Sequence, residues 1–398
     1  MKCRICDSTN LELALDLGDQ PWCNNFLSKE EVGKEDYYPL RLLYCMDCCT
    51  SQLDYTVKKE IMFGNHTYLS GITKSLSDHF LNVATKVDSQ FFANQKEKSI
   101  LDIGSNDGTQ LIHFQKLGYE VLGVESSEIT SKIANDRGVP TLNAFFNLDS
   151  MKSIGRKFDL FNAAGVFFHL EELHSVCDAI QFGLKENGVF VVQFLYMKSI
   201  MENLAFDQIY HEHLLYYTLE TIEKLLARHG LEMFDARLDP IHGGSIIGYI
   251  GHKGVFPVTE ALDKMRVLES ESQCNSFSAY VNFKEQVYKM KDENVAFLEE
   301  AKSKGKTVFG FGAPVKGNTM LNFFKVGPDH IQCLVEKNQL RKGLYSPGMH
   351  IPIVMESEVM VPPDIYYVLA WNFKNEILAN NRDLIDSGVE FYFPVNPI

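Results

Sequence analysis

Long apolar runs and clustered basic charge are both scarce in this chain of 398 residues. No apolar stretch reaches the roughly 18 residues of a membrane-spanning helix, and the start, MKCRICDSTN, has no apolar core of a secretion signal. The formal net charge is −14, which disfavours binding to nucleic acid because phosphate contacts need clustered Lys and Arg. We therefore expect a soluble cytoplasmic protein of two or three domains that binds neither membrane nor nucleic acid. The composition leaves the oligomeric state open.

Nine cysteines, an odd number, argue against a pure disulfide framework. Four of them form two C-x-x-C pairs, Cys3 with Cys6 and Cys45 with Cys48. Four thiolates at this spacing suit a structural zinc ion, which would supply folding energy to a small module; four buried free thiols are the alternative. Cys49 could replace Cys48, although the two-residue spacing favours Cys48. The segment between the pairs is not basic, which disfavours a nucleic-acid finger.

A glycine-rich loop follows an apolar segment in the middle of the chain. Residues 100–103 (ILDI) predict a buried strand, 104–108 (GSNDG) a loop, 111–117 a helix, and 121–124 a second strand that ends at Glu125. This is the opening half of a doubly wound fold, with an acidic residue about 20 positions after the first glycine to bind ribose hydroxyls. The loop departs from G-x-G-x-x-G, and its Asp107 would repel a pyrophosphate. S-adenosylmethionine, which carries a cationic centre and no phosphate, fits better than a dinucleotide.

The alternating pattern continues beyond that loop. Residues 158–162 predict a strand followed by His169, near the edge where open α/β sheets bind ligands. Residues 260–306 are charged with a helical pattern and predict a bridge to a second strand–loop–helix unit, whose loop reads GFGAPVKG at 310–317. A helix start of this kind favours anions, and Lys316 could neutralise a phosphate; a loop with packing duties only is the alternative.

The segment IYHEHLLYYT, residues 209–218, concentrates imidazole, carboxyl and phenol groups. Such groups transfer protons near neutral pH. A solvated polar edge is the alternative for the segment taken alone.

In this order along the chain, the motifs resemble those of the sugar C-methyltransferase family. The resemblance runs nearly end to end and is carried by both C-x-x-C pairs, LDIGSNDG, YHEHLLYY, HGGS at 242–245, GFGAPVKGNTMLN at 310–322, YSPGMHIPI and LAWNF. It implies an α/β protein with a small zinc-binding module (1–65), a Rossmann-like methyltransferase core (66–255) and a second Rossmann-like domain that helps to bind substrate (256–398). It further implies methyl transfer from S-adenosylmethionine to C3 of a nucleotide-linked 4-keto-6-deoxyhexose.

The resemblance also assigns candidate site residues by motif. The implied zinc ligands are Cys3, Cys6, Cys45 and Cys48, and the implied cofactor residues are Gly104, Asn106, Asp107, Gly108 and Glu125. The implied catalytic group is Tyr68, His169, Tyr210, Glu212 and His213. The residues themselves, a glycine-rich turn between the lobes and a lysine at a helix start, add the candidate substrate contacts His242, Gly243, Ser245 and Lys316.

The chemistry of a ketone gives these groups roles. The C–H bond beside a ketone is acidic, so we expect His213 to abstract that proton, oriented by Glu212, while Tyr210 or His169 donates a hydrogen bond to the enolate oxygen. His211 is the reserve base. If the segment is extended, His211 and His213 share a face and Glu212 points away; if it is a loop, that objection lapses. The sugar, its nucleotide and the face of methylation stay open. Alternatives are an O- or N-methyltransferase, an NAD-dependent oxidoreductase and a zinc-bearing binding protein.

Overall fold

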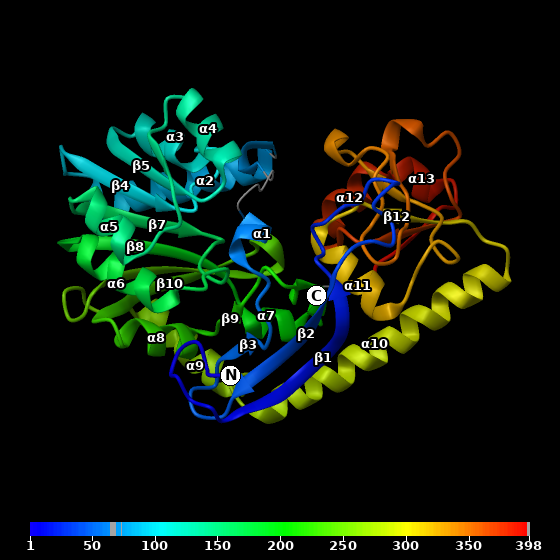
Figure 1. Ribbon diagram of the computed structural model, residues 1–398, viewed down its shortest axis with the longest axis horizontal. Helices are drawn as coiled ribbons and strands as arrows, with labels where there is room; N and C mark the ends of the chain where they lie inside the picture. The colour runs from blue at the N-terminus through cyan, green and yellow to red at the C-terminus, as the bar shows by residue number, and fades with distance from the viewer. Residues whose placement is uncertain (64–68, 73, 396–398) are drawn as a thin grey trace.

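The computed structural model describes residues 1–63, 69–72 and 74–395. Within these residues the chain forms three sheets: one of four strands at the amino terminus, one of seven in the core and one of five near the carboxyl terminus. The core and carboxy-terminal sheets lie in separate lobes, and the amino-terminal strands run between them (Figure 1). The predicted α/β architecture with two Rossmann-like lobes is confirmed.

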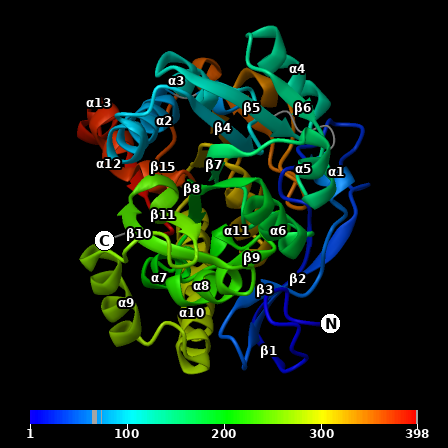
Figure 2. The same cartoon turned by 90° about the vertical axis from the view of Figure 1, so that its left-hand side faces the viewer.

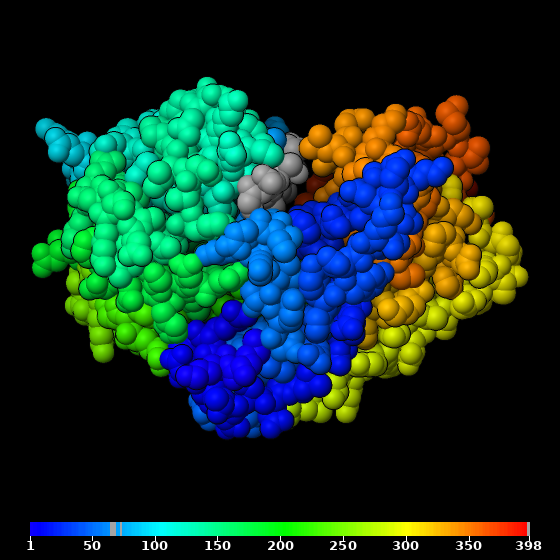
Figure 3. Space-filling view, in the orientation of Figure 1, coloured from blue at the N-terminus to red at the C-terminus, as the bar shows by residue number. Residues whose placement is uncertain are grey.

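The amino-terminal sheet is antiparallel and borrows its last strand from the middle of the chain. Its order is β1-β2-β3-β9, with β1 at Leu11–Pro21, β2 at Tyr37–Cys45, β3 at Ser51–Leu53 and β9 at Leu215–Tyr216. A short helix, α1 (Lys59–Phe63), follows. The space-filling view in Figure 3 shows the amino-terminal part of the chain, in blue, lying across the junction of the two lobes.

The core sheet has the order β10-β11-β8-β7-β4-β5-β6. Its parallel strands are β4 (Lys98–Ile103), β5 (Tyr119–Glu125), β6 (Thr141–Asn143), β7 (Phe158–Ala164) and β8 (Leu184–Leu195). Two antiparallel strands complete it, β11 (Ser245–His252) beside β8 and β10 (Leu231–Asp239) at the edge. The chain proceeds from β4 toward β6, then returns to β7 on the other side of β4. Open sheets bind ligands at such a switch point, outside the carboxyl ends of the strands.

Helices cover both faces of the core sheet. Apolar residues of α2 (Lys74–Val87), α3 (Thr109–Lys116) and α4 (Glu128–Asp136) pack on one face, and those of α5 (Leu148–Ile154), α6 (Leu173–Gly183) and α8 (Leu219–Ala227) on the other. The hydroxyls of Ser127 and Thr218 cap α4 and α8 by accepting a main-chain N–H, which satisfies groups that a helix start leaves unpaired. The short α7 (Met197–Glu202) and the 3-10 turn η3 (Phe206–Gln208) follow β8.

Two helices join the lobes, as the charged helical pattern predicted. α9 (Glu260–Ser272) packs near β10, and α10 (Phe277–Ser303) runs 27 residues, about 40 Å, toward the second lobe. Figure 2 shows α8, α9 and α10 together below the core sheet. Ser276 caps α10 through its hydroxyl.

The carboxy-terminal sheet is entirely parallel, with the order β14-β13-β12-β15-β16. Its strands are β12 (Val308–Phe311), β13 (Leu334–Glu336), β14 (Ile353–Met355), β15 (Ile365–Val368) and β16 (Glu390–Tyr392). The helices are α11 (Val315–Phe324), α12 (Lys374–Asn380) and α13 (Arg382–Asp386). The switch point lies between β12 and β15, so Lys316 and Trp371 both follow its strands.

No helix among residues 1–63, 69–72 and 74–395 is long and apolar enough to cross a membrane.

Candidate active site

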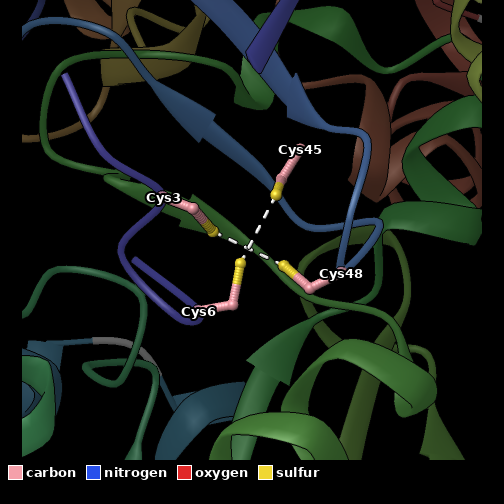
Figure 4. A group of neighbouring side chains, drawn as sticks. All are labelled: Cys3, Cys6, Cys45 and Cys48. Carbon is pink, nitrogen blue, oxygen red and sulfur yellow. Dashed lines mark hydrogen bonds between the residues drawn. The ribbon is translucent and has the colours of Figure 1, made fainter. Parts of the chain in front are cut away.

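The four predicted zinc ligands come together at one end of the amino-terminal hairpin. Their sulfur atoms all lie within 4.8 Å of one another, with Cys3 Sγ 3.4 Å from Cys48 Sγ and Cys6 Sγ 3.5 Å from Cys45 Sγ. Zinc bound to four sulfurs at about 2.3 Å separates them by about 3.8 Å, close to these distances. Figure 4 shows the sulfurs converging on a common centre. The group therefore fits a structural zinc ion, and Cys23 and Cys49 lie outside it.

The predicted cofactor loop wraps around a carboxylate at the switch point of the core sheet. Gly104, Asn106 and Gly108 all have positive φ values, 67°, 51° and 76°. A Cβ atom on Gly104 would lie 2.8 Å from Cγ2 of Val166, so only glycine fits there. Glu125, at the end of β5, accepts hydrogen bonds from the main-chain N–H of Asn106 at 2.9 Å and of Ser127 at 2.8 Å.

Asp107 is turned inward. Its carboxylate is fully buried, lies 2.9 Å from Nη1 of Arg137, and accepts hydrogen bonds from the Gly71 N–H at 3.1 Å and the Thr109 hydroxyl at 2.7 Å. Arg137 thus compensates its charge. The expected repulsion of a pyrophosphate by Asp107 is wrong for the folded protein, because the carboxylate is paired with Arg137 and stabilises the loop.

Residues 210–213 form a turn, in which the His213 N–H donates to the Tyr210 carbonyl at 2.9 Å. The loop geometry is therefore the one adopted, and the side chains diverge. The Glu212 carboxylate accepts hydrogen bonds from Nε1–H of Trp22 at 2.8 Å and from the Asn24 amide at 3.2 Å. His211 is buried, with Nε2 3.3 Å from the Tyr38 carbonyl. Both side chains point toward the amino-terminal segment.

His213 is only 4% exposed and has the geometry of a neutral base. Its Nδ1 lies 2.8 Å from the carbonyl oxygen of Gln208, which can only accept a hydrogen bond, so Nδ1 carries the hydrogen and donates it. The lone pair therefore resides on Nε2, which has no hydrogen-bond partner among the residues that the structure describes. Burial, followed by the nearby His169, lowers the pKa of His213 well below its usual value, so the ring is neutral at pH 7.

Aromatic and imidazole rings surround that base. The ring of Tyr210 is 3.9 Å from the His213 ring, centre to centre, and that of His169 is 5.1 Å away. Nδ1 of His169 lies 2.5 Å from the Glu212 carbonyl, which fixes the orientation of this second imidazole. Burial, then the charge of Glu212, raises the pKa of the Tyr210 phenol, so its O–H is retained as a donor.

The expected orientation of His213 by Glu212 is wrong. The Gln208 carbonyl orients the imidazole, and the Glu212 carboxylate faces Trp22 and Asn24. The reserve base His211 faces the Tyr38 carbonyl on the amino-terminal side, not the His169 ring.

The second lobe meets the core at η3, directly before the turn at residues 210–213. Nε1–H of Trp371 donates to the buried carboxylate of Asp207 at 2.7 Å, and Nζ of Lys316 lies 3.9 Å from the same oxygen and 3.5 Å from the Trp371 ring centre. Burial lowers the pKa of Lys316 to about 8. Lys316 therefore faces the core lobe, and no hydrogen-bond acceptor is within reach of its ammonium group among the described residues.

The HGGS segment, residues 242–245, packs at the same contact between the core and the second lobe. A Cβ atom on Gly243 would lie 2.8 Å from the Trp371 ring, and the His242 carbonyl accepts a hydrogen bond from the Gln208 amide at 2.8 Å. His242 is exposed, whereas Ser245 is buried and its hydroxyl donates to the Ile241 carbonyl at 3.1 Å. Ser245 thus supports the turn, and its predicted substrate contact stays a prediction.

Three family models match this chain in succession. A "Putative zinc binding domain" matches residues 3–63, a "Methyltransferase domain" residues 77–236, and a "C-methyltransferase C-terminal domain" residues 240–396. C-methyltransferase NovU from Streptomyces niveus is 27% identical over 400 residues, covering 99% of this chain and 95% of its own. The chain is therefore a C-methyltransferase with an amino-terminal zinc-binding domain. It is an enzyme that uses S-adenosylmethionine.

Solved methyltransferase structures resemble part of this C-methyltransferase. Magnesium protoporphyrin IX methyltransferase from Synechocystis PCC 6803 with bound SAH is 14% identical, with a TM-score of 0.36, covering 44% of this chain and 83% of its own. The plantazolicin methyltransferase BpumL in complex with SAH is 18% identical, with a TM-score of 0.37, covering 45% and 86%.

Several residues of the C-methyltransferase site had no sequence signal. Trp22 and Asn24 are about 190 positions from Glu212, and Gln208 acts on His213 through its main chain, which no side-chain pattern reveals. Asp207 and Gln208 do lie directly before YHEH, so proximity to the motif was the one available signal. The predicted Tyr68 lies outside the described residues, as does the predicted boundary between residues 65 and 66.

Proposed function

We propose that this C-methyltransferase methylates C3 of a nucleotide-linked 4-keto-6-deoxyhexose through an enolate, in branched deoxysugar biosynthesis. The observation that carries the proposal is the neutral, buried His213, whose Nδ1 is bound to the Gln208 carbonyl and whose Nε2 is available. A carbon becomes nucleophilic only after it loses a proton, so C-methylation needs a base of this kind.

In this proposal Nε2 of His213 abstracts the proton from C3. The electron pair of the C–H bond forms a double bond between C3 and C4, and negative charge develops on the C4 oxygen. The Tyr210 phenol lies against the base with its proton retained, and His169 lies on its other side. The phenol can donate a hydrogen bond to that oxygen, whereas the proton on Nδ1 of His169 is already donated to the Glu212 carbonyl. A donor placed before the reaction stabilises the developing charge.

The cofactor is assigned to the loop at the core switch point. Gly104, Asn106 and Gly108 would let the main chain approach the cofactor closely, and Glu125 would accept hydrogen bonds from its ribose hydroxyls. Asp107 stabilises the conformation of this loop through its ion pair with Arg137 and its hydrogen bond from the Thr109 hydroxyl. When bound, S-adenosylmethionine supplies an electrophilic methyl group on a sulfonium centre.

The nucleotide sugar is assigned to the junction of the two lobes. Lys316 presents an ammonium group with unused donors beside η3, and His242 and Gly243 line the same junction. A cation that is largely buried binds a phosphate oxygen strongly because little water competes. The proposed division into residues 1–65, 66–255 and 256–398 places the substrate between the second and third parts.

The test is the position of the transferred methyl group. Purified enzyme is incubated with methyl-13C S-adenosylmethionine and thymidine or guanosine diphosphate 4-keto-6-deoxyhexoses, and the products are analysed by NMR. A new carbon–carbon bond at C3 supports the proposal. A methyl group on oxygen, or no product from any nucleotide 4-keto sugar, contradicts it.

A further inference from the structure

We infer that Trp22 and Asn24 are positioning residues of the active site, so that the zinc-bearing segment forms part of the catalytic apparatus. This inference rests on the proposed function of the turn at 210–213. It goes beyond a zinc module that contributes folding energy alone.

The contact begins at the Glu212 carboxylate, which is 6% exposed. Its Oε1 accepts two hydrogen bonds, one from the indole N–H of Trp22 at 2.8 Å and one from the amide of Asn24 at 3.2 Å. Burial raises the pKa of Glu212, and these two donors oppose that rise. A buried carboxylate without donors is costly, so the segment after β1 keeps this side chain in place.

Fixing Glu212 also fixes the two imidazoles. Its main-chain carbonyl accepts the hydrogen bond from His169, and its neighbour His213 is tied to Gln208 on the other side. A displacement of Glu212 therefore moves both the His169 ring and the proposed base. Misplacement of a base by about 1 Å can reduce a rate about a hundredfold.

Further contacts connect the same turn to the hairpin. The His211 ring meets Tyr38 edge to face, with centres 5.8 Å apart, and its Nε2 approaches the Tyr38 carbonyl. On the other side of the turn, β9 pairs with β3, with the Leu53 N–H donating to the Leu214 carbonyl at 3.0 Å. The catalytic turn is therefore held by the amino-terminal segment at several points.

The experiment compares Trp22→Phe and Asn24→Ala with a matched control, Asn10→Ala. Asn10 also donates an amide hydrogen bond from the amino-terminal segment to a carboxylate, that of Asp47 at 3.1 Å, but on the exposed surface. For each protein we would measure kcat, KM for both substrates, bound zinc and the Kd of S-adenosylmethionine. Exchange of the C3 hydrogen in heavy water reports the base directly.

We expect Trp22→Phe and Asn24→Ala each to lower kcat and C3 exchange by about tenfold, the loss of one hydrogen bond to a charged group. Zinc content and cofactor Kd should match those of the wild type. Asn10→Ala should retain wild-type kcat. Unchanged kcat and exchange in both Trp22→Phe and Asn24→Ala would overturn the inference.

A double-mutant cycle separates positioning from a general loss of folding. Glu212→Ala removes the acceptor, so adding Trp22→Phe to it should cost less than about twofold further. Additive losses would overturn the inference, even if each variant folds poorly. Failure of the proposed function is distinguishable from failure of this inference, because it would appear as the absence of a C3-methyl product from the wild-type enzyme.

Discussion

At the scale of single residues, the three ionisable side chains of the catalytic turn have three different partners. His211 approaches Tyr38, Glu212 accepts from Trp22 and Asn24, and His213 donates to Gln208. Side chains that are adjacent in sequence diverge in a turn, so neighbours in the motif do not bind one another. This is why the motif alone indicates candidate catalytic residues but does not reveal the hydrogen bond that orients the His213 ring.

Replacement of His213 tests the base. His213→Gln keeps a polar side chain of similar size but removes the basic lone pair, so kcat should fall about 10²- to 10⁴-fold. The Kd of S-adenosylmethionine should not change. The matched control is His252→Gln, because Nε2 of His252 also lies 3.2 Å from a main-chain carbonyl, that of Leu184, at the far end of β11. Near-normal turnover in His213→Gln would exclude this base.

The lowered pKa of His213 predicts a pH effect on stability. In the unfolded chain a histidine has a pKa of about 6.5, whereas the folded value is well below that of the free side chain. As the pH falls below about 6.5, the unfolded chain takes up a proton that the folded protein excludes, so the free energy of unfolding decreases.

The contribution of His213 to the pH dependence of stability can be measured by comparing the wild type with His213→Gln. Urea unfolding at pH 7.5 and 5.5 should show a smaller acid-induced loss of stability in His213→Gln than in the wild type. The difference in slope is at most about 1.4 kcal/mol per pH unit for one proton. Equal slopes in the two proteins would contradict a neutral, proton-excluding His213.

At the scale of elements, the two-residue strand β9 links the zinc end of the hairpin to the catalytic turn. It pairs with β3, which begins three residues after Cys48 and pairs in turn with β2. The core strands β4, β5 and β7 and the helix α3 follow their apolar periodicity and were predicted from it. A strand as short as Leu215–Tyr216 has no such signal, and its partner is about 165 positions away in the chain.

Removal of zinc should therefore loosen the turn. Metal-free protein, prepared with a chelator, should show faster hydrogen exchange at residues 51–53 and 214–216 and a lower Tm, because zinc binding is coupled to folding of its module. The strand Val308–Phe311 serves as the internal control, since it lies in the other lobe. Unchanged exchange at 214–216 in metal-free protein would contradict the link.

At the scale of the whole molecule, the second lobe meets the core lobe with its switch point facing η3. Trp371 follows β15 and Lys316 follows β12, and both approach Asp207 of the core. The sequence predicted two Rossmann-like lobes, because each has its own strand–loop–helix pattern. It could not predict their relative placement, which depends on the length of α10 and on the Asp207–Trp371 hydrogen bond.

That junction should control substrate binding more than cofactor binding. Trp371→Phe removes the N–H donor to the buried Asp207 carboxylate, which should destabilise the protein by about 1–3 kcal/mol. It should also raise KM for the nucleotide sugar while the Kd of S-adenosylmethionine stays unchanged. The control is Phe373→Leu in the same turn, since Phe373 is 46% exposed. A changed cofactor Kd with an unchanged sugar KM would contradict this assignment.

The most direct test of the account is exchange of the C3 hydrogen of a nucleotide-linked 4-keto-6-deoxyhexose in heavy water, followed by mass spectrometry. Wild-type enzyme without S-adenosylmethionine should incorporate one deuterium at C3, His213→Gln should not, and wild-type enzyme with the cofactor should form the C3-methyl sugar. Methylation without any dependence on His213, or deuterium incorporation that persists in His213→Gln, would contradict an enolate formed by this base.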